Sequence, residues 1–535
     1  MTRHLVTVAL LLTALTGCDT GDDAASTEER TSTEAPVYTA VPPEKADDYR
    51  SPIASEFRVK GTHRLVLPES DAELTGEALE ARVQFLVQKR FQLTSGFLFA
   101  YLTRKLSDKP NHGYGGFRST VREQSFEAMH ITPVEGEALT WTFDFEADIA
   151  GPDNLMSQLP LDANGWFSLA MMKVDPEVLE HFNGGMFTGF DPRQFEDEWL
   201  DSIDLHVSPS PKTPDAFPDY RKLFEDGVFD VSIHVGGDYN EDRWDRRNAF
   251  NVFALLQYHL GLTPPVATME ELTFDSGPFT GEIVAGGQTV KIEVYLYYPD
   301  MAQDEAGYEK LLDIYRANAA KRDVVIYDGH AGYNDGISGI TVSYSPTVTL
   351  PIPELTDIDL PEKSQLFMFN GCKSYAGYAD ALYAHPNKDN TNLDVISTID
   401  FGYLVELPRV STGVLRHLTQ VENGVHVPKS YDQILNDLNT GISAQVMYGV
   451  HGLSDNPRRS PWADESTLCS PCETSDACPG EENLCVHVGP VPYCTMACLD
   501  DSGCPSGFTC FPIAVSNAKA IIGHQCMPDG LLCGQ

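Results

Sequence analysis

Two residues of complementary chemistry follow two short apolar runs of this 535-residue chain. The run 324–327 is followed after a turn by His330, and the run 366–369 is followed after a similar turn by Cys372. A thiol with an imidazole in reach suffices for nucleophilic catalysis, because the imidazole takes the thiol proton and leaves a reactive thiolate. We therefore predict that Cys372 is a nucleophile and that His330 is its general base.

Short apolar runs bounded by turn residues are typical of buried strands, and catalytic groups of open α/β sheets gather at the carboxyl ends of such strands. From 225 to 455 strand patterns alternate with helical ones, which predicts an α/β domain with a mostly parallel sheet and helices on both faces. The strands expected are 228–235, 279–284, 290–298, 324–327, 366–369 and 393–399, and the helices are 241–260, 305–321, 375–383, 411–420 and 431–448.

The two turns, Asp328-Gly329-His330 and Asn370-Gly371-Cys372, resemble the motifs of peptidases of the caspase–hemoglobinase fold, which include caspases, legumain, gingipain and clostripain. In that family one apolar strand ends in His-Gly, the next ends in the nucleophilic Cys, and a helix follows. The separation of His330 and Cys372, 372 − 330 = 42 residues, is of the size that the family shows. The resemblance covers residues 225–450 and implies a caspase-like fold that cleaves peptide bonds.

The resemblance also implies an oxyanion hole formed by backbone N–H groups near the Cys and after the His. Such donors must be preorganised, and glycines let the backbone approach the substrate. The family usually has Gly directly after the His, where this chain has Ala331, whose N–H is nevertheless retained. The oxyanion candidates are Gly329, Ala331, Gly332 and Gly371.

Several charged residues surround these motifs. Asp400 follows the strand 393–399 and could receive a cationic substrate side chain, or could simply cap a loop. Asp328 or Asp335 could orient the imidazole, or could be turn residues. Lys373 would lower the pKa of the neighbouring thiol if the two side chains face each other.

The first residues predict export. A short basic start precedes the apolar run 5–15, which is too short to span a bilayer as a mature helix and ends at Cys18. This arrangement (1–18) resembles the bacterial lipoprotein signal, in which cleavage before the cysteine leaves it lipid-modified at the new N-terminus. An ordinary secretory signal is the alternative. Residues 19–47 are acidic and poor in apolar groups, which predicts a disordered tether. The resemblance implies a protein of the bacterial cell envelope, attached to the membrane by lipid and facing the periplasm or the exterior.

Ten of the 12 cysteines lie in the last part of the chain, 469–535, which predicts a disulfide-rich module in an exported protein. The spacing repeats in two units, each with a Cys-Pro step; a zinc site is the alternative. The ten are Cys469, Cys472, Cys478, Cys485, Cys494, Cys498, Cys504, Cys510, Cys526 and Cys533. With Cys18 assigned to lipid, Cys372 is the odd one, either buried and inert or reactive.

Between the tether and the Pro-rich stretch 208–218, the segment 54–210 is mostly strand-like, with apolar and polar residues alternating at 58–68 and 139–145, which predicts a β-rich, sandwich-like domain. Periodicity leaves open whether 77–106 is a helix or long strands. The histidines of this domain do not stand at metal-ligand spacing, and we predict no metal and no cofactor. The net charge of −41 argues against nucleic acid as a partner.

Two other functions compete with a cysteine peptidase. An α/β-hydrolase would use Cys372 at a strand-to-helix elbow, with Asp400 and one of His417, His426 or His451 as its acid and histidine. The elbow requires small residues on both sides of the nucleophile, and Asn370 fits this poorly. A non-catalytic surface-binding lipoprotein with a degenerate peptidase-like domain would instead have a buried, unreactive Cys372.

Overall fold

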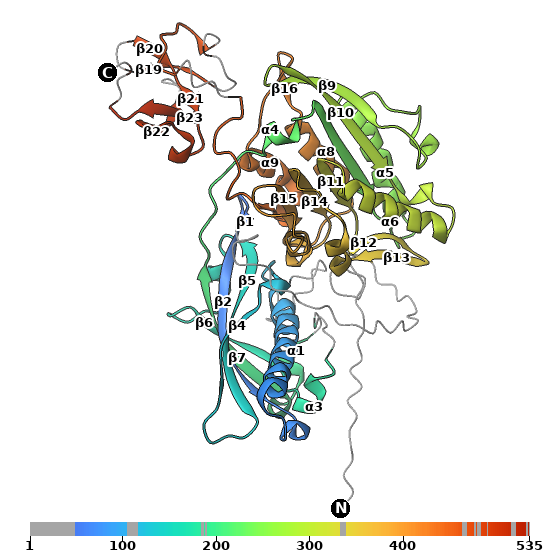
Figure 1. Ribbon diagram of the computed structural model, residues 1–535, viewed down its shortest axis with the longest axis vertical. Helices are drawn as coiled ribbons and strands as arrows, with labels where there is room; N and C mark the ends of the chain where they lie inside the picture. The colour runs from blue at the N-terminus through green and yellow to red at the C-terminus, as the bar shows by residue number, and fades with distance from the viewer. Residues whose placement is uncertain are drawn as a thin grey trace, which may run out of the picture.

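The computed structural model describes residues 49–535 apart from several segments. These segments are 104–115, 183–186, 188–189, 332–338, 463–467, 476–477, 479–482, 489–490, 515–520, 531–532 and 534–535. The chain is multidomain, with an N-terminal sheet-and-helix unit, a central α/β domain and a C-terminal cysteine-rich module (Figure 1). No helix among the described residues is long and apolar enough to cross a membrane. The predicted signal, the tether and Cys18 lie outside the described residues.

The central domain is built on a ten-stranded mixed sheet, ordered β1-β18-β15-β14-β11-β8-β10-β9-β17-β16. The five strands from β15 to β10 run parallel, and β18 and β9 flank them antiparallel. The strands are β1 Tyr49–Arg50, β8 Val228–Val235, β9 Phe279–Ala285, β10 Gln288–Tyr297, β11 Val324–Asp328, β14 Gln365–Asn370, β15 Leu393–Thr398, β16 Val421–Glu422, β17 Val425–His426 and β18 Tyr448–His451. A hairpin of β12 (Gly339–Tyr344) and β13 (Thr347–Pro351) follows β11.

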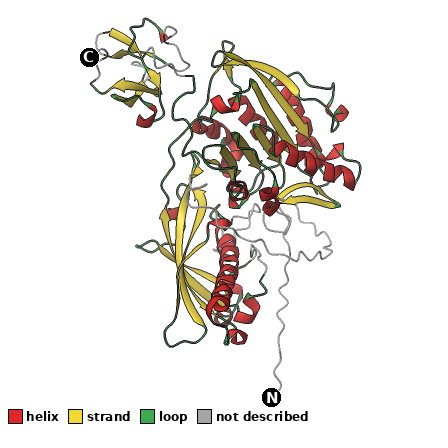
Figure 2. Cartoon of the chain, in the orientation of Figure 1, coloured by secondary structure: helices red, strands yellow, loops and turns green. Residues whose placement is uncertain are grey.

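Alternate side chains of the central strands enter two separate cores, as expected for a sheet buried on both faces. Val324 and Ile326 pack with α5, α8 and α9, whereas Val325 and Tyr327 pack with α6 and α7. Figure 2 shows these helices around the sheet. The α-helices of this domain are α4 Tyr220–Leu223, α5 Trp244–Tyr258, α6 Glu305–Ala319, α7 Tyr378–Tyr383, α8 Leu407–Leu418 and α9 Tyr431–Leu438. Its 3₁₀ helices are Met269–Glu271, Pro299–Met301, Ile352–Asp357, Ser374–Ala376 and Gly441–Gln445.

The predicted helix 431–448 is wrong in its second half. Helix α9 ends at Leu438, and the chain turns back as the strand β18, antiparallel to β15. Residues 448–451 therefore pair in the sheet, which periodicity over the whole segment did not separate from a helix.

The N-terminal unit is one antiparallel sheet packed on a long helix (Figure 2). Its strands are β2 Ala54–Val66, β3 Thr120–Val121, β4 Glu127–Pro133, β5 Thr140–Pro152, β6 Trp166–Met172 and β7 Leu200–Pro209. Its helices are α1 Gly76–Leu102, α2 Leu155–Gln158 and α3 Pro176–Leu179, with 3₁₀ helices at Glu69–Asp71, Glu123–Ser125, Pro192–Gln194 and Asp197–Trp199. The open segment 77–106 is thus the helix α1 as far as Leu102. The sandwich form of the prediction is not confirmed, because in the described residues α1 covers the face that a second sheet would cover.

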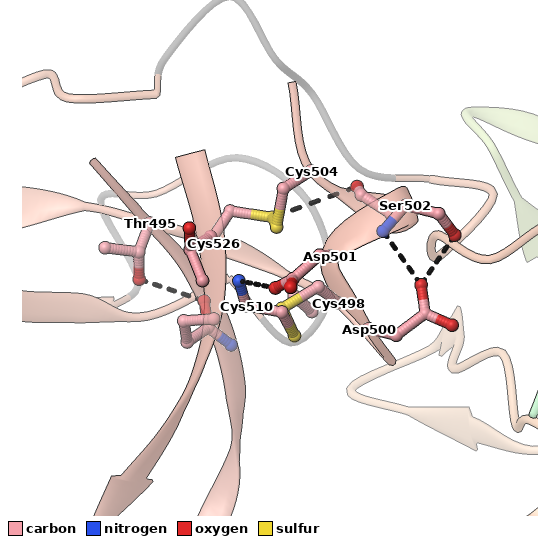
Figure 3. Close-up of a disulfide and its surroundings, with 12 residues drawn as sticks. Thr495, Cys498, Asp500, Asp501, Ser502, Cys504, Cys510 and Cys526 are labelled. Atoms are coloured by element: carbon pink, nitrogen blue, oxygen red, sulfur yellow. Dashed lines mark hydrogen bonds between the residues drawn. A yellow bond between two sulfur atoms is a disulfide. The ribbon is translucent and has the colours of Figure 1, made fainter. Parts of the chain in front are cut away.

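The C-terminal module is held by five disulfides, so its cysteines are not zinc ligands. Figure 3 shows the four cysteines of the second unit. Both repeat units pair their first cysteine with the third and their second with the fourth. The bonds are Cys472–Cys485, Cys478–Cys494, Cys498–Cys510 and Cys504–Cys526, and Cys469–Cys533 ties the ends. The strands are β19 Cys485–Val488, β20 Val491–Cys494, β21 Met496–Ala497, β22 Phe508–Ala514 and β23 Ile521–Pro528, with a 3₁₀ helix at Asp501–Gly503.

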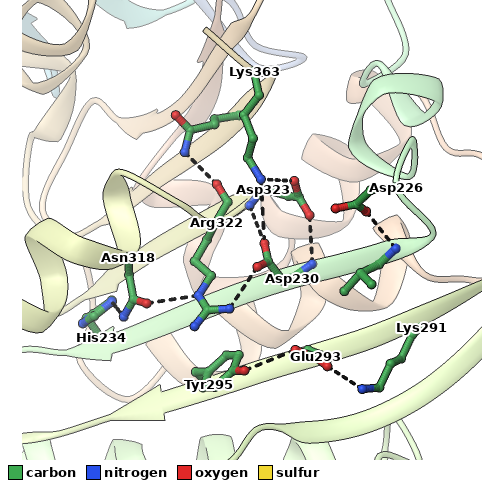
Figure 4. Close-up of polar contacts among 12 residues, drawn as sticks. Asp226, Asp230, His234, Lys291, Glu293, Tyr295, Asn318, Arg322, Asp323 and Lys363 are labelled. Atoms are coloured by element: carbon green, nitrogen blue, oxygen red, sulfur yellow. Dashed lines mark hydrogen bonds and ion pairs between the residues drawn. The ribbon is translucent and has the colours of Figure 1, made fainter. Parts of the chain in front are cut away.

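At the amino ends of the parallel strands, an ion cluster ties β8 to the segments that lead into β11 and β14 (Figure 4). Arg322 lies 2.9 Å from Asp230, and Lys363 lies 2.6 Å from Asp323. The Asp323 carboxylate also accepts the backbone N–H of Asp230. The charges at this edge are therefore paired with one another, and they tie the three strands together.

Candidate active site

Four chemically active side chains follow four neighbouring parallel strands at the carboxyl edge of the sheet. Asp238 follows β8, His330 follows β11, Cys372 follows β14 and Asp400 follows β15. Strands β11 and β14 are paired in register up to their last residues, and His330 and Cys372 each stand two residues beyond. The fold therefore brings the two predicted residues to equivalent positions on adjacent strands.

The imidazole of His330 is bonded to Asp238, a residue that the sequence analysis did not single out. Nε2 of His330 lies 3.0 Å from Oδ1 of Asp238, and the two side chains are 3% and 2% exposed. An ionised carboxylate only accepts, so the neutral imidazole carries its proton on Nε2. Nδ1 of His330 is buried without a hydrogen-bond partner in the described part of the chain. This nitrogen is the one available as a base.

Asp238 is itself fixed by backbone donors. Its carboxylate accepts from the N–H of Trp244, at the start of α5, and from the N–H and the side-chain amide of Asn240. Burial acts to raise the pKa of Asp238, but the hydrogen bonds from His330, Trp244 and Asn240 outweigh it and keep the pKa below the ordinary value. Asp238 thus stays ionised and holds His330 in one orientation.

Two tyrosine hydroxyls and two tyrosine rings hold the loop that carries His330. Tyr327 donates to the carbonyl of His330 at 2.7 Å, and Tyr378 of α7 donates to the carbonyl of the next residue at 2.6 Å. The ring of Tyr239 stacks on the imidazole at 4.7 Å, and that of Tyr344 meets it edge-on at 5.7 Å. These contacts leave the imidazole little freedom to rotate.

Cys372 is buried, at 6% exposure, and its sulfur is disulfide-bonded. The described residues contain no free cysteine. The loop of Cys372 is pinned to β15, since Thr398 donates to the carbonyl of Gly371 and the N–H of Lys373 donates to the carbonyl of Asp400. The prediction that Cys372 is an unpaired thiol is therefore wrong, because the spacing of cysteines along the chain does not show which sulfur reaches position 372.

The oxyanion candidates lie where the loops after β11 and β14 touch. The N–H of Gly329 donates to the carbonyl of Asn370, so this donor is already used. A side chain at 371 would meet the carbonyl of Gly329 at 2.6 Å and the methyl group of Ala331 at 2.7 Å, so glycine at 371 leaves room for Ala331. Gly332 lies outside the described residues.

Asp328 does not contact His330 but bonds sideways to the next strand. Its Oδ1 accepts from Asn370 at 2.8 Å, and Asn370 also contacts Ser411 and Tyr448. Burial raises the pKa of Asp328 to about 8, against hydrogen bonds from Ser411 and Asn370 that lower it. The other candidate for orienting the imidazole, Asp335, lies outside the described residues.

Lys373 and Asp400 turn toward the N-terminal unit. The ammonium of Lys373 lies 2.7 Å from the hydroxyl of Thr103, and Asp400 pairs with Arg118 at 3.2 Å. Burial lowers the pKa of Lys373 to about 7, although Asp400 acts to raise it. The carboxylate predicted to receive a cationic side chain is thus occupied by a cation of this same chain.

The residues required by an α/β-hydrolase do not gather at Cys372. His417 contacts Asp437 at 3.2 Å, and His426 lies at the far edge of the sheet between Trp462 and the carbonyl of Leu418. His451 is packed among the rings of Tyr49 and Tyr375. The positive φ that a strained elbow would place on its nucleophile falls on Lys373 instead.

Asp238 could have been found from the sequence, because it follows a predicted strand and a Gly-Gly turn, as Asp400 follows its strand. What the sequence could not show was that β8 lies directly beside β11.

No protein-family model, curated protein or solved structure matches the chain.

Proposed function

We propose that this chain is an exported, lipid-anchored cysteine peptidase-like protein of the bacterial cell envelope, with Cys372 as nucleophile and His330 as general base. The observation that carries the proposal is the buried hydrogen bond between Asp238 and His330, on the strand beside the one that delivers Cys372. A carboxylate–imidazole pair activates a thiol that comes within hydrogen-bond reach of the imidazole. The sulfur of Cys372 lies 3.9 Å from the carbonyl oxygen of Gly402, so the proposal requires it to turn toward Nδ1 of His330. A caspase-like domain is part of this proposal, and it requires the His330 and Cys372 strands to be neighbours, as β11 and β14 are.

The proposed reaction uses the free ring nitrogen of His330. Nδ1 takes the proton of the Cys372 thiol, and the thiolate attacks the carbonyl carbon of a peptide bond. The imidazolium then gives its proton to the leaving amine, and water hydrolyses the resulting thioester with His330 again as the base. Asp238 keeps the proton on Nε2 and stabilises the imidazolium while it exists.

Where Cys372 is disulfide-bonded, the protein is in a resting form in this proposal. Ten of the other 11 cysteines pair within the C-terminal module, so a protein with a lipid thioether at Cys18 has Cys372 as a thiol and needs no reduction. A dithiol reductant opens the disulfide by thiol–disulfide exchange, which frees both sulfurs as thiols and oxidises the reductant to its own disulfide. The proposal therefore predicts no hydrolysis by the oxidised protein and hydrolysis after reduction.

A library of fluorogenic peptides, with and without dithiol, tests the proposal. Hydrolysis that appears on reduction and is lost in both Cys372→Ala and His330→Ala supports it. Hydrolysis that survives His330→Ala, or none at all with Cys372 shown by mass spectrometry to be reduced, contradicts it. The lipid anchor is tested by substituting Cys18→Ala, which should release the protein from the membrane, and by the intact mass of the mature protein, which should include the lipid. A lipid thioether at Cys18 would also prevent that sulfur from forming a disulfide.

A second candidate is a non-catalytic binding lipoprotein. It is favoured by the burial of both His330 and Cys372 and by the disulfide at Cys372, because these features suit a site retained for stability. In that case the reduced protein bears no activity, and substituting His330 or Asp238 changes only the free energy of unfolding.

A further inference from the structure

The N-terminal unit contacts the segment that directly follows Cys372 at three buried positions. Lys373, Tyr375 and Asp380 each bond to a side chain of that unit, from a different part of it. The contacts therefore converge on one loop and the helix after it.

The first contact is at Lys373. Its ammonium donates to Thr103, at the carboxyl end of α1, and lies between the rings of Phe99 and Phe401, at 4.1 and 4.5 Å from their centres. The side chain of Lys373 is 2% exposed. Because Phe401 follows β15, this ammonium ties α1 to two of the loops at the catalytic edge.

The contacts at Asp380 and Tyr375 belong to one buried ion network. Nε and one terminal nitrogen of Arg122 lie 2.9 and 2.6 Å from Oδ1 of Asp380. Arg122 also lies 3.9 Å from Glu56, whose carboxylate accepts the hydroxyl of Tyr375 at 2.6 Å. A buried charge that loses its partner is strongly destabilising, so separating the two units would be costly and the network opposes it.

A fourth contact lies outside this segment and covers Asp400. Arg118, just before β3, pairs with its carboxylate and donates to the carbonyl of Gln445. An apolar cluster continues the same interface, formed by Tyr49, Ala54, Ala150, Tyr375, Ile399 and Met447. The N-terminal unit therefore occupies the edge of the sheet on the Asp400 side of Cys372.

The geometry points to an autoinhibitory role of the N-terminal unit: through Thr103, Arg118 and Arg122 it clamps the Cys372 loop closed and fills the place beside Asp400. The inhibitory part of this inference rests on the proposed function, whereas the clamp itself does not. Release of the unit opens the segment 372–380 and exposes Asp400.

Hydrogen exchange of the resting full chain, with its disulfides intact, tests the clamp without any activity. Thr103→Val keeps the shape of the side chain and removes the acceptor of Lys373, and Arg118→Ala removes the cation at Asp400. Arg64→Ala is the control, because Arg64 on β2 pairs with Glu137 in an exposed position. Each clamp variant should speed exchange in peptides covering 369–383 by about tenfold, as loss of a buried polar contact shifts a local opening equilibrium. The control should leave exchange unchanged.

Unchanged exchange of 369–383 in both Thr103→Val and Arg118→Ala would overturn the inference, as would an equal rise in the control. If exchange in Arg118→Ala rises throughout 54–210, that variant has unfolded the N-terminal unit locally. Exchange of 369–383 in Thr103→Val alone then supports or overturns the inference. After reduction, the clamp variants should hydrolyse peptides faster than the parent. If no variant hydrolyses peptides while exchange rises as expected, the proposed function fails and the clamp stands.

Discussion

Asp238 and His330, 92 residues apart in the chain and in loops that follow different strands, are joined by a hydrogen bond of 3.0 Å in a buried setting. The two nitrogens of the imidazole therefore have different environments. Nε2 anchors the ring to a carboxylate that is held by backbone N–H groups, and Nδ1 is left to accept a proton.

Replacing Asp238 with Asn should lower kcat/KM of the reduced protein by about 10²- to 10⁴-fold, because the amide neither fixes the same tautomer nor stabilises the imidazolium. Peptide hydrolysis rates measure this. Asp300→Asn is the matched control, since Asp300 is an acid nearby in the fold that pairs with Arg243 at the surface. Wild-type hydrolysis by Asp238→Asn would exclude a role for this carboxylate.

The buried acid Asp328 should make stability depend on pH. Its folded pKa of about 8 lies above the unfolded value of about 4, so the folded state binds the extra proton between these limits. Its contribution to stability is therefore complete below pH 4 and is lost as pH rises toward 8, by at most about 1.4 kcal/mol per pH unit. Asp328→Asn should remove this slope. The free energy of unfolding of the parent and of Asp328→Asn, measured with urea at pH 5, 6.5 and 8, checks this prediction. The same dependence on pH in both proteins would contradict it.

The buried pair of Arg122 and Asp380 should show opposite effects of single and double substitution. Arg122→Met leaves the Asp380 carboxylate buried without its main cation and should cost about 3–5 kcal/mol. Combining it with Asp380→Leu should recover most of that loss, because an apolar pair has no charge to desolvate. Chemical denaturation measures both. Additive losses would show that the two residues do not act as a pair.

The disulfides of the C-terminal module should differ in their contribution to its stability. Cys469–Cys533 spans 64 residues and Cys498–Cys510 spans 12. The chain-entropy relation assigns them about 4 and about 3 kcal/mol. Replacing both cysteines of the longer link by Ala should therefore lower the thermal midpoint of the module more than replacing those of the shorter one. The reverse order would contradict this relation for the module.

The sequence predicted much of the central sheet because its strands are short apolar runs that end in turns. The predicted strand 228–235 coincides with β8, and the predicted helix 305–321 contains α6. The placement of His330 and Cys372 at strand ends followed from the same runs. Helix α1 was left open, because it is buried on nearly all sides from Lys89 to Leu102 and so lacks an apolar stripe.

The sequence could not predict contacts between residues that are far apart in the chain. The pairing of Asp238 with His330 depends on β8 lying beside β11, and the contact of Lys373 with Thr103 joins residues 270 positions apart. The disulfide state of Cys372 likewise depends on a second sulfur elsewhere in the chain. Local sequence patterns indicate candidate site residues, whereas the order of the strands in the sheet determines which of these residues are in contact.

The most direct test of the account is the alkylation rate of Cys372 after reduction of the native protein, followed by mass spectrometry of the peptide that contains it. An activated thiol should react rapidly at pH 7 in the folded protein, and His330→Ala should slow it by about tenfold or more, because the base that forms the thiolate is gone. A Cys372 that reacts only on denaturation, or at the same rate without His330, would contradict the account and favour the binding lipoprotein.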